Sequence, residues 1–175
     1  MKTLVVNLIA GPGSGKSTLA HGLMWKLKSI PGVKAEYVPE YAKQLVYSEN
    51  WVGLKDQWHI LATQDHWLQR VSGKVDVIVH DAALPLGIIY APPGTNMENF
   101  SAEAWRLYDS YENFTVFVER VKPYEQYGRY QDEIAARALD RPILDLFGNR
   151  INMEVPGTED AVEKVLPHIL RRIRP

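Results

Sequence analysis

The 175 residues carry 20 lysines and arginines against 21 aspartates and glutamates, and 46% of them are hydrophobic. These proportions are typical of one globular domain with a substantial core, and a net charge of −1 gives no overall attraction to nucleic acid. The absence of cysteine excludes disulfides and cysteine-ligated metals, and no apolar run is long enough to cross a bilayer. We therefore expect a single-domain cytoplasmic enzyme over residues 1–175, with no membrane partner.

The first predicted elements are a strand and a helix joined by a glycine-rich turn. An apolar run over about residues 3–9 predicts a buried strand. From Leu19 to Ile30, apolar residues recur at helical spacing, so we expect a helix over about 16–29 that ends before Pro31. A strand, a glycine-rich turn and a helix in this order are the context that a P-loop requires, whereas an ordinary glycine-rich turn needs neither flank.

The turn itself has the composition of a phosphate-binding loop. Its glycines let successive backbone N–H groups point toward one phosphate, and the following helix directs its positive end to the same place. We expect Lys16 to contact the β- and γ-phosphates of ATP and the Ser17 hydroxyl to hold Mg²⁺. Ala10 stands where the usual pattern has its first glycine, and Gly11 follows one residue late. The residues expected to bind the nucleotide are Gly11, Pro12, Gly13, Ser14, Gly15, Lys16, Ser17 and Thr18.

Apolar runs and helical patterns alternate along the rest of the chain, which predicts βαβ units and a parallel sheet. Further strands are expected at about 34–38, 75–81, 114–118 and 151–155. The expected helices are a short one after Pro39, then about 54–71, 101–111, 131–147 and one from Thr158. Ser101 should cap the third of these, and Pro142 and Pro167 should break or kink the last two. The predicted fold is α/β, a P-loop domain with a roughly five-stranded parallel sheet and helices on both faces.

Two carboxylates follow predicted strands and should reach the edge of the sheet where the P-loop lies. Asp81 could hold Mg²⁺ or take a proton from an acceptor hydroxyl, and the alternative is a surface acid that caps the next helix. Glu40 could bind acceptor hydroxyls or act as the base, and the alternative is a simple helix-start acid after Pro39. Either residue could therefore serve as general base.

A polar, aromatic and basic stretch after the fourth predicted strand is interpreted as a lid over about 120–140. Arg120, Lys122 and Arg129 could meet the charge that builds on a transferred phosphoryl group, with Gly128 as a pivot. Arg129 is the residue that we expect to stabilise the transition state. For any single arginine the alternative is a solvated surface charge.

Aromatic residues cluster between the second and third predicted strands, at Tyr41, Tyr47, Trp51, Trp58 and Trp67. Aromatic faces can stack a nucleobase, so this region is a candidate acceptor site. Core packing is the alternative, and it is the better interpretation of Trp58, which lies on an apolar stripe. The five histidines show no metal-ligand spacing and are interpreted as structural.

The two ends of the fifth predicted strand are candidates for the adenine side of the nucleotide site. Asn149 and Arg150 precede this strand, and Pro156 and Gly157 follow it. This assignment rests on position alone.

Taken together, the motifs resemble a family of small P-loop kinases. The chain is similar to the kinase module of bacterial ribosylnicotinamide kinases and to phage-encoded relatives that phosphorylate the hydroxymethyl group of 5-hydroxymethyluracil within DNA. The resemblance rests on Gly11–Thr18, Glu40-Tyr41-Ala42, Gln57, Gln64, Asp81, Lys122-Pro123-Tyr124 and Gly128-Arg129.

This resemblance implies Mg²⁺-dependent transfer of the ATP γ-phosphate to a hydroxyl of a nucleoside-like acceptor. The best candidate is the hydroxymethyl group of 5-hydroxymethyluracil in phage DNA, which would place the enzyme in the host cytoplasm. A free nucleoside, a nucleoside monophosphate or ribosylnicotinamide is the alternative acceptor. A nucleotide-hydrolysing switch or binding module is the alternative of another class.

Overall fold

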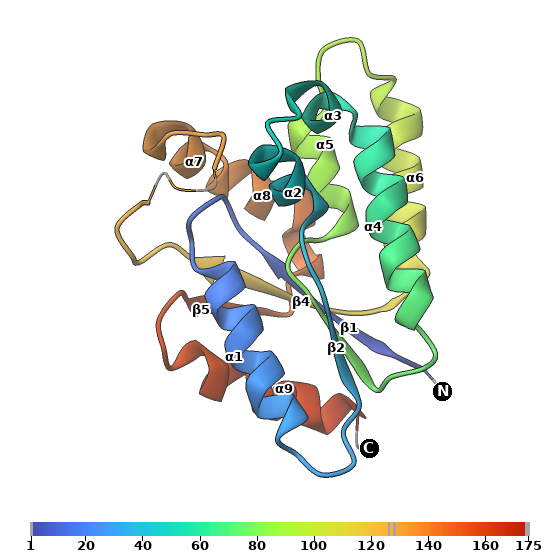
Figure 1. Ribbon diagram of the computed structural model, residues 1–175, viewed down its shortest axis with the longest axis vertical. Coiled ribbons are helices and arrows are strands. Elements are labelled where there is room, and N and C mark those ends of the chain that lie inside the picture. Colours follow the sequence, from blue (N-terminus) through green and yellow to red (C-terminus); the bar gives the residue numbers. More distant parts are fainter. Residues whose placement is uncertain (1, 126, 128, 174–175) are drawn as a thin grey trace.

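A five-stranded, wholly parallel sheet forms the centre of the computed structural model, which describes residues 2–125, 127 and 129–173 (Figure 1). The strands are β1 (Leu4–Ile9), β2 (Ala35–Val38), β3 (Val77–His80), β4 (Glu112–Glu119) and β5 (Met153–Pro156). Their order is β2-β3-β1-β4-β5, so β1 lies in the middle, and Val6 faces Val79 on one side and Phe114 on the other. The crossover direction reverses at β1, and ligands of open α/β sheets bind at such a point.

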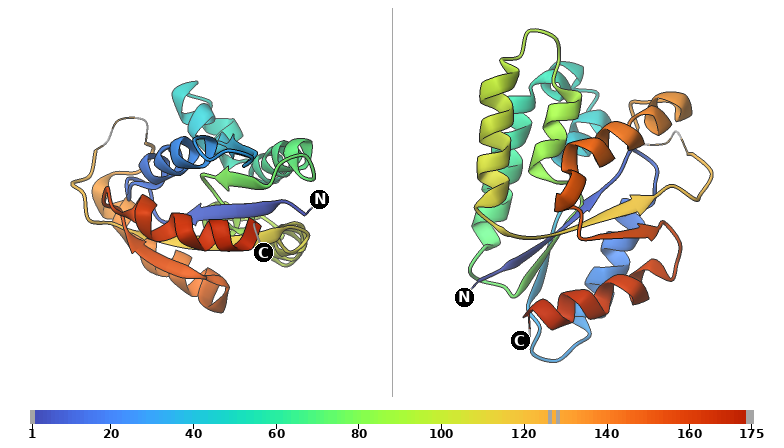
Figure 2. Two further views of the ribbon diagram at one scale, coloured as in Figure 1. Left: turned by 90° about the horizontal axis from the view of Figure 1, so that it is seen from below. Right: turned by 180° about the vertical axis from the view of Figure 1, so that it is seen from behind.

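Helices cover both faces of this sheet, as the sequence predicts. The helices are α1 (Lys16–Lys28), α2 (Tyr41–Tyr47), α3 (Trp51–Lys55), α4 (Gln57–Val71), α5 (Gly87–Tyr90), α6 (Met97–Asp109), α7 (Glu133–Ala138), α8 (Asp140–Phe147) and α9 (Ala161–Ile173), with 3₁₀ turns η1 (Leu84–Leu86) and η2 (Gly148–Arg150). Helices α1 and α9 pack against each other and contact β1, whereas α4 and α6 pack together and contact β2 and β4 (Figure 2). Right-handed crossovers place the two groups on opposite faces.

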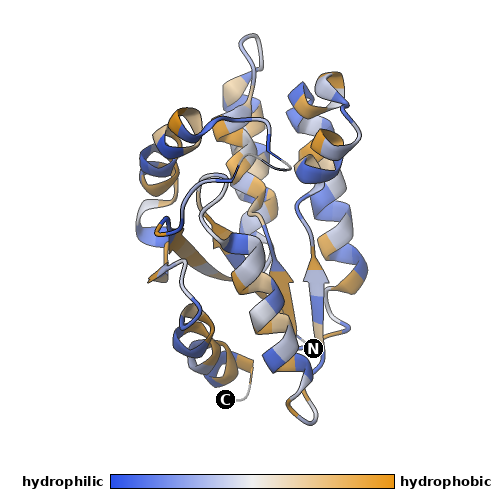
Figure 3. Cartoon of the chain, turned by 60° about the vertical axis from the view of Figure 1, so that its left-hand side comes forward, coloured by the Kyte–Doolittle hydropathy of each residue, from blue (hydrophilic) through white to orange (hydrophobic). Residues whose placement is uncertain are grey.

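The core follows from the composition of the strands. All six residues of β1 are buried, which is expected for a central parallel strand covered on both faces. The surrounding helices mix hydrophobic and hydrophilic residues along their length (Figure 3). No helix within the described ranges is both long enough and apolar enough to span a bilayer.

Helix boundaries differ from the predicted ones where side chains cap the backbone. The predicted helix over 54–71 is divided into α3 and α4, because the Asp56 carboxylate accepts a hydrogen bond from His59 N and starts a new helix. Likewise, α6 begins at Met97 with Asn96 as its cap, so the prediction of Ser101 as the cap is wrong.

Two prolines are accommodated differently from the simple expectation. The predicted helix over 131–147 is two helices that meet at Leu139, and Pro142 lies in the first turn of α8, where its missing N–H has no helical partner to lose. Helix α9 continues through Pro167.

Candidate functional site

The loop between β1 and α1 has the backbone geometry that a P-loop requires. Gly13 and Gly15 have φ angles of 80° and 105°, in the left-handed region that favours glycine. The Lys16 ammonium group donates to the carbonyls of Ala10 at 3.0 Å and Gly11 at 3.3 Å, so it lies across the loop. Both predicted flanks, the strand and the helix, are present.

Gly11 is explained by a contact from a distant part of the chain. Its N–H donates to Asp140 Oδ1 at 3.0 Å, and a Cβ atom at this position would lie 2.4 Å from that oxygen and 2.6 Å from the carbonyl oxygen of Ala136. A side chain larger than that of glycine would therefore push α7 and α8 away from the loop. The glycine that appears one residue late in the motif is required by this close approach.

Arg120 holds the same contact together. Its side chain is 3% exposed, and its guanidinium donates to the Pro12 carbonyl at 2.6 Å, to the Ala136 carbonyl at 3.3 Å and to both oxygens of Asp140 at 3.3 Å. Arg120 thus fastens the start of α8 to the phosphate-binding loop, and its contact with a transferred phosphoryl group stays a prediction.

The carboxylate of Asp81 meets the P-loop at the end of β3. Its Oδ2 accepts hydrogen bonds from Ser17 Oγ at 2.5 Å and from the Tyr37 hydroxyl at 3.2 Å. Asp81 is only 2% exposed, and its Oδ1 is buried without a hydrogen-bond partner among the described residues. Burial, together with the charge of Asp81, raises the pKa of Tyr37, which therefore stays protonated.

Ser17 Oγ and the Asp81 carboxylate are oxygen donors of the kind that fit a magnesium ion. Mg²⁺ prefers hard oxygen donors, usually one or two from the protein, and the unsatisfied Asp81 Oδ1 shows that a further polar group is needed there. Ser17 Oγ and Asp81 would hold the ion. When bound, it would neutralise charge on the phosphates.

Glu40 stands at the entry to α2 and is half-buried. Burial raises the pKa of its carboxyl group, and the charge of Asp81 adds to this, whereas the charges of Lys16 and Lys43 lower the pKa. A carboxylate with a raised pKa in a cavity is suited to proton transfer.

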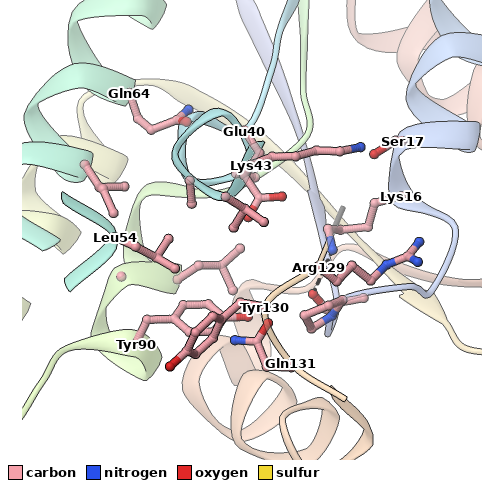
Figure 4. A pocket seen from close by; sticks show the side chains of 18 of the residues that line it. Lys16, Ser17, Glu40, Lys43, Leu54, Gln64, Tyr90, Arg129, Tyr130 and Gln131 are labelled. Atoms are coloured by element: carbon pink, nitrogen blue, oxygen red, sulfur yellow. Dashed lines mark hydrogen bonds between the residues drawn. The ribbon is translucent and has the colours of Figure 1, made fainter. Parts of the chain in front are cut away.

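A cavity of about 680 Å³ is lined by Lys16, Ser17 and Glu40 (Figure 4). At one end it is lined by the P-loop, including Lys16 and Ser17, and at the other by apolar side chains of α2 to α5. Glu40 lies between the two ends (Figure 4). The apolar and aromatic residues of the second end are Val46, Trp51, Leu54, Ile60, Leu61, Leu84, Leu86 and Tyr90.

The segment between β4 and α7 contributes the remaining wall. Arg129, Tyr130 and Gln131 line the cavity from this segment, with Arg129 on the P-loop side (Figure 4). The Arg129 guanidinium lies over the Tyr124 ring, 5.3 Å from its centroid. Gly128, the expected pivot, lies outside the described residues.

The predicted lid cation Lys122 and the next two arginines, Arg137 and Arg141, are not among the residues that line this cavity. Arg137 pairs with Glu133 at 2.8 Å and Arg141 with Asp145 at 2.9 Å, each one turn along an exposed helix. Lys122 is exposed and is not among the residues that line the cavity.

The aromatic cluster divides into cavity residues and packing residues. Trp51 lines the cavity and contacts Tyr130 at a ring distance of 5.5 Å. Tyr47 contacts Tyr127, with the ring centroids 5.9 Å apart. These two contacts join α2 and α3 to the segment after β4.

The other aromatics of the cluster pack against neighbouring rings. Trp58 packs edge-on against Phe100 at 5.0 Å, as the packing interpretation predicts. The Tyr41 and Trp67 rings are 5.4 Å apart.

Sequence reasoning missed a buried hydrogen-bond network beneath α2. Gln64 Nε2 lies 2.7 Å from His80 Nε2, and His80 Nδ1 lies 3.2 Å from Asn7 Oδ1. Gln64 Oε1 accepts from the Tyr41 backbone N–H, next to Glu40. Burial lowers the pKa of His80 to about 3, so the ring is neutral. The network ties the start of α2 to the middle of the sheet; its only sequence signal is polar residues within buried elements.

The two candidate adenine-side positions separate in the structure. Arg150 pairs with Asp109 and lies over the Trp105 ring at 4.5 Å, before β5 and thus at the edge of the sheet opposite the P-loop. That half of the prediction is wrong. Gly157 lies against the P-loop, because a Cβ atom there would be 2.1 Å from the Ser14 carbonyl oxygen.

No protein-family model matches the sequence. A search of curated proteins finds no match either. Among solved structures, the chain is similar to the Mycobacterium tuberculosis APS kinase CysC in complex with AMPPNP and APS, with a TM-score of 0.53 and 16% identity over 97% of this chain and 98% of that one. It is also similar to Chaetomium thermophilum Kti12 in complex with ADP-AlF3, with a TM-score of 0.55 and 11% identity over 99% and 100% of the two chains. The chain therefore has the α/β P-loop fold that these nucleotide-bound proteins share.

Proposed function

We propose that this protein is a Mg²⁺-dependent kinase that transfers the γ-phosphate of ATP to a hydroxyl group of a nucleoside-like acceptor. The observation that carries the proposal is the cavity that runs from Lys16 and Ser17, past Glu40, to its apolar second end, which we call the chamber. A hydrolysing switch needs a water site but no such chamber. The nucleotides bound to the structurally similar APS kinase and Kti12 agree with ATP as the donor.

The geometry supports a division of roles between the two acids. Asp81 accepts hydrogen bonds from Ser17 and Tyr37, so it lies on the side of the site where Ser17 would hold Mg²⁺. Glu40 lines the open cavity and would accept the proton of the acceptor hydroxyl. The acceptor oxygen then forms a bond to the γ-phosphorus, and the bond from that phosphorus to the bridging oxygen breaks to release ADP.

Cations would stabilise the charge that develops during this transfer. Lys16 would leave the carbonyls of Ala10 and Gly11 to contact the β- and γ-phosphates. Arg129 lines the same cavity on the P-loop side and would stabilise the transition state.

For the acceptor, our specific candidate is the hydroxymethyl group of 5-hydroxymethyluracil in DNA. The aromatic walls at Trp51, Tyr90 and Tyr130 would accept a planar ring, and an extruded base would enter at a cost of a few kcal/mol. A free nucleoside is the second candidate. The contacts of Trp51 with Tyr130 and of Tyr47 with Tyr127 join α2 and α3 to the segment after β4. A chamber whose walls are joined in this way favours a small free nucleoside over a base that is still attached to DNA.

Salt dependence separates these two acceptors. The apparent KM of an oligonucleotide that contains 5-hydroxymethyluracil is expected to rise steeply with salt concentration, because contacts to its phosphates release counterions. The KM of the free nucleoside is expected to change little. Phosphorylation of the nucleoside alone, with the oligonucleotide inert at every salt concentration, would contradict the DNA assignment and leave a small-nucleoside kinase.

A further inference from the structure

Lys43 extends from α2 into the cavity and toward Ser17 (Figure 4). It approaches the phosphate end from the side of α2, whereas Lys16 approaches from the P-loop itself. Lys43 lies two residues after Tyr41, whose backbone N–H is held by Gln64. The buried network of Gln64, His80 and Asn7 thereby fixes the base of the helix that carries this lysine.

No contact among the described residues explains Lys43 as a structural residue. The side chain is exposed, and it forms no hydrogen bond or ion pair with any residue that the structure describes. In the described part of the cavity wall, Glu40 is the one carboxylate. Three cations, Lys16, Lys43 and Arg129, line the phosphate end, whereas Lys55 lines the opposite end from α3. An excess of positive charge in a cavity attracts an anionic ligand such as a polyphosphate.

We propose that Lys43 is a catalytic residue that contacts the transferred phosphoryl group from the acceptor side. This inference rests on the proposed kinase function. Lys16 and Lys43 would then approach the phosphoryl group from the P-loop and from α2, respectively, while the acceptor oxygen enters from the chamber.

The contact has a clear chemical use in the transfer step. While the bond from the acceptor oxygen to phosphorus forms and the bond to the bridging oxygen breaks, negative charge is spread over the three equatorial oxygens of the phosphoryl group. A fixed ammonium group beside those oxygens stabilises this charge. Glu40 is the N-cap residue of α2 and Lys43 lies three residues later in that helix, and the charge of Lys43 opposes the rise in the pKa of Glu40 caused by burial. The proton acceptor and the cation are therefore carried by one element.

The test uses a probe that does not depend on the acceptor. Aluminium fluoride with MgADP mimics the transferred phosphoryl group, so binding is measured by calorimetry with MgADP alone and with MgADP plus aluminium fluoride. Lys43→Gln is expected to leave the MgADP dissociation constant nearly unchanged and to weaken the fluoride complex by about 10²-fold, the usual effect of losing one charge-stabilising donor. Lys43→Arg is expected to restore most of the binding.

Lys55→Gln is the matched control, because Lys55 is also exposed, lines the same cavity from α3 and forms no hydrogen bond or ion pair with the described residues. It should leave both affinities unchanged. Equal weakening by Lys43→Gln and Lys55→Gln, weakening of MgADP alone, or no fluoride-dependent gain in the wild-type protein would overturn the proposal for Lys43. If the Lys43 result holds but no acceptor is phosphorylated, the proposed kinase function fails and the phosphoryl contact stands.

Discussion

Replacing Lys16 with alanine is expected to abolish phosphoryl transfer and to leave the protein folded. Among the described residues the ammonium group makes two hydrogen bonds, both to carbonyls of its own loop, so its loss should cost little stability. In the reaction, the same group would neutralise charge on the β- and γ-phosphates, and loss of such a contact lowers kcat by about 10²–10³ or more. The measurement is kcat with each accepted substrate, beside the thermal midpoint of unfolding.

Lys28→Ala is the control for this variant, because Lys28 lies at the far end of the same helix and pairs with Glu36 on the surface. It should retain wild-type turnover. Near-normal turnover of Lys16→Ala with any acceptor would show that the P-loop does not bind the reacting phosphates.

The second large effect is expected at Glu40. Glu40→Gln keeps the size of the side chain but cannot accept a proton, so kcat should fall by about 10²–10⁴ while ATP binding is retained. The base works only when ionised, and burial raises the pKa of Glu40 above 4.5. In the wild-type protein, kcat/KM should therefore fall as the pH is lowered through this raised pKa, and Glu40→Gln should lack that acidic limb.

Glu36→Gln is the matched control, since Glu36 is an exposed acid of β2 whose partner is Lys28. It is expected to leave both kcat and the pH profile unchanged. Full activity of Glu40→Gln together with loss of activity in Asp81→Asn would assign the base to Asp81 instead.

The parts of the site that the sequence predicts are those formed by neighbouring residues. The P-loop is one continuous stretch between a strand and a helix, so Lys16 and Ser17 lie where the motif places them. Asp81 follows a buried apolar strand, and in a parallel sheet that strand ends beside the P-loop. Connectivity alone brings these groups together.

The parts that could not be predicted depend on contacts between distant residues. Arg120 is a basic residue of the predicted lid, but Asp140 and the Pro12 carbonyl hold its guanidinium, and Arg120 is not among the residues that line the cavity. The requirement for glycine at position 11 arises from Asp140, 129 residues away. His80 and Gln64 are ordinary polar residues until the fold buries them side by side.

Transfer of a labelled γ-phosphate from ATP is the measurement that tests the kinase assignment most directly. The acceptors to compare are DNA containing 5-hydroxymethyluracil, plain DNA, free nucleosides, nucleoside monophosphates and ribosylnicotinamide, each with Mg²⁺ and each beside a reaction without acceptor. The proposed function predicts label on a hydroxyl group of at least one acceptor and slow hydrolysis when no acceptor is present. Fast release of labelled phosphate that no acceptor changes would contradict it, and would identify the protein as a nucleotide-hydrolysing switch.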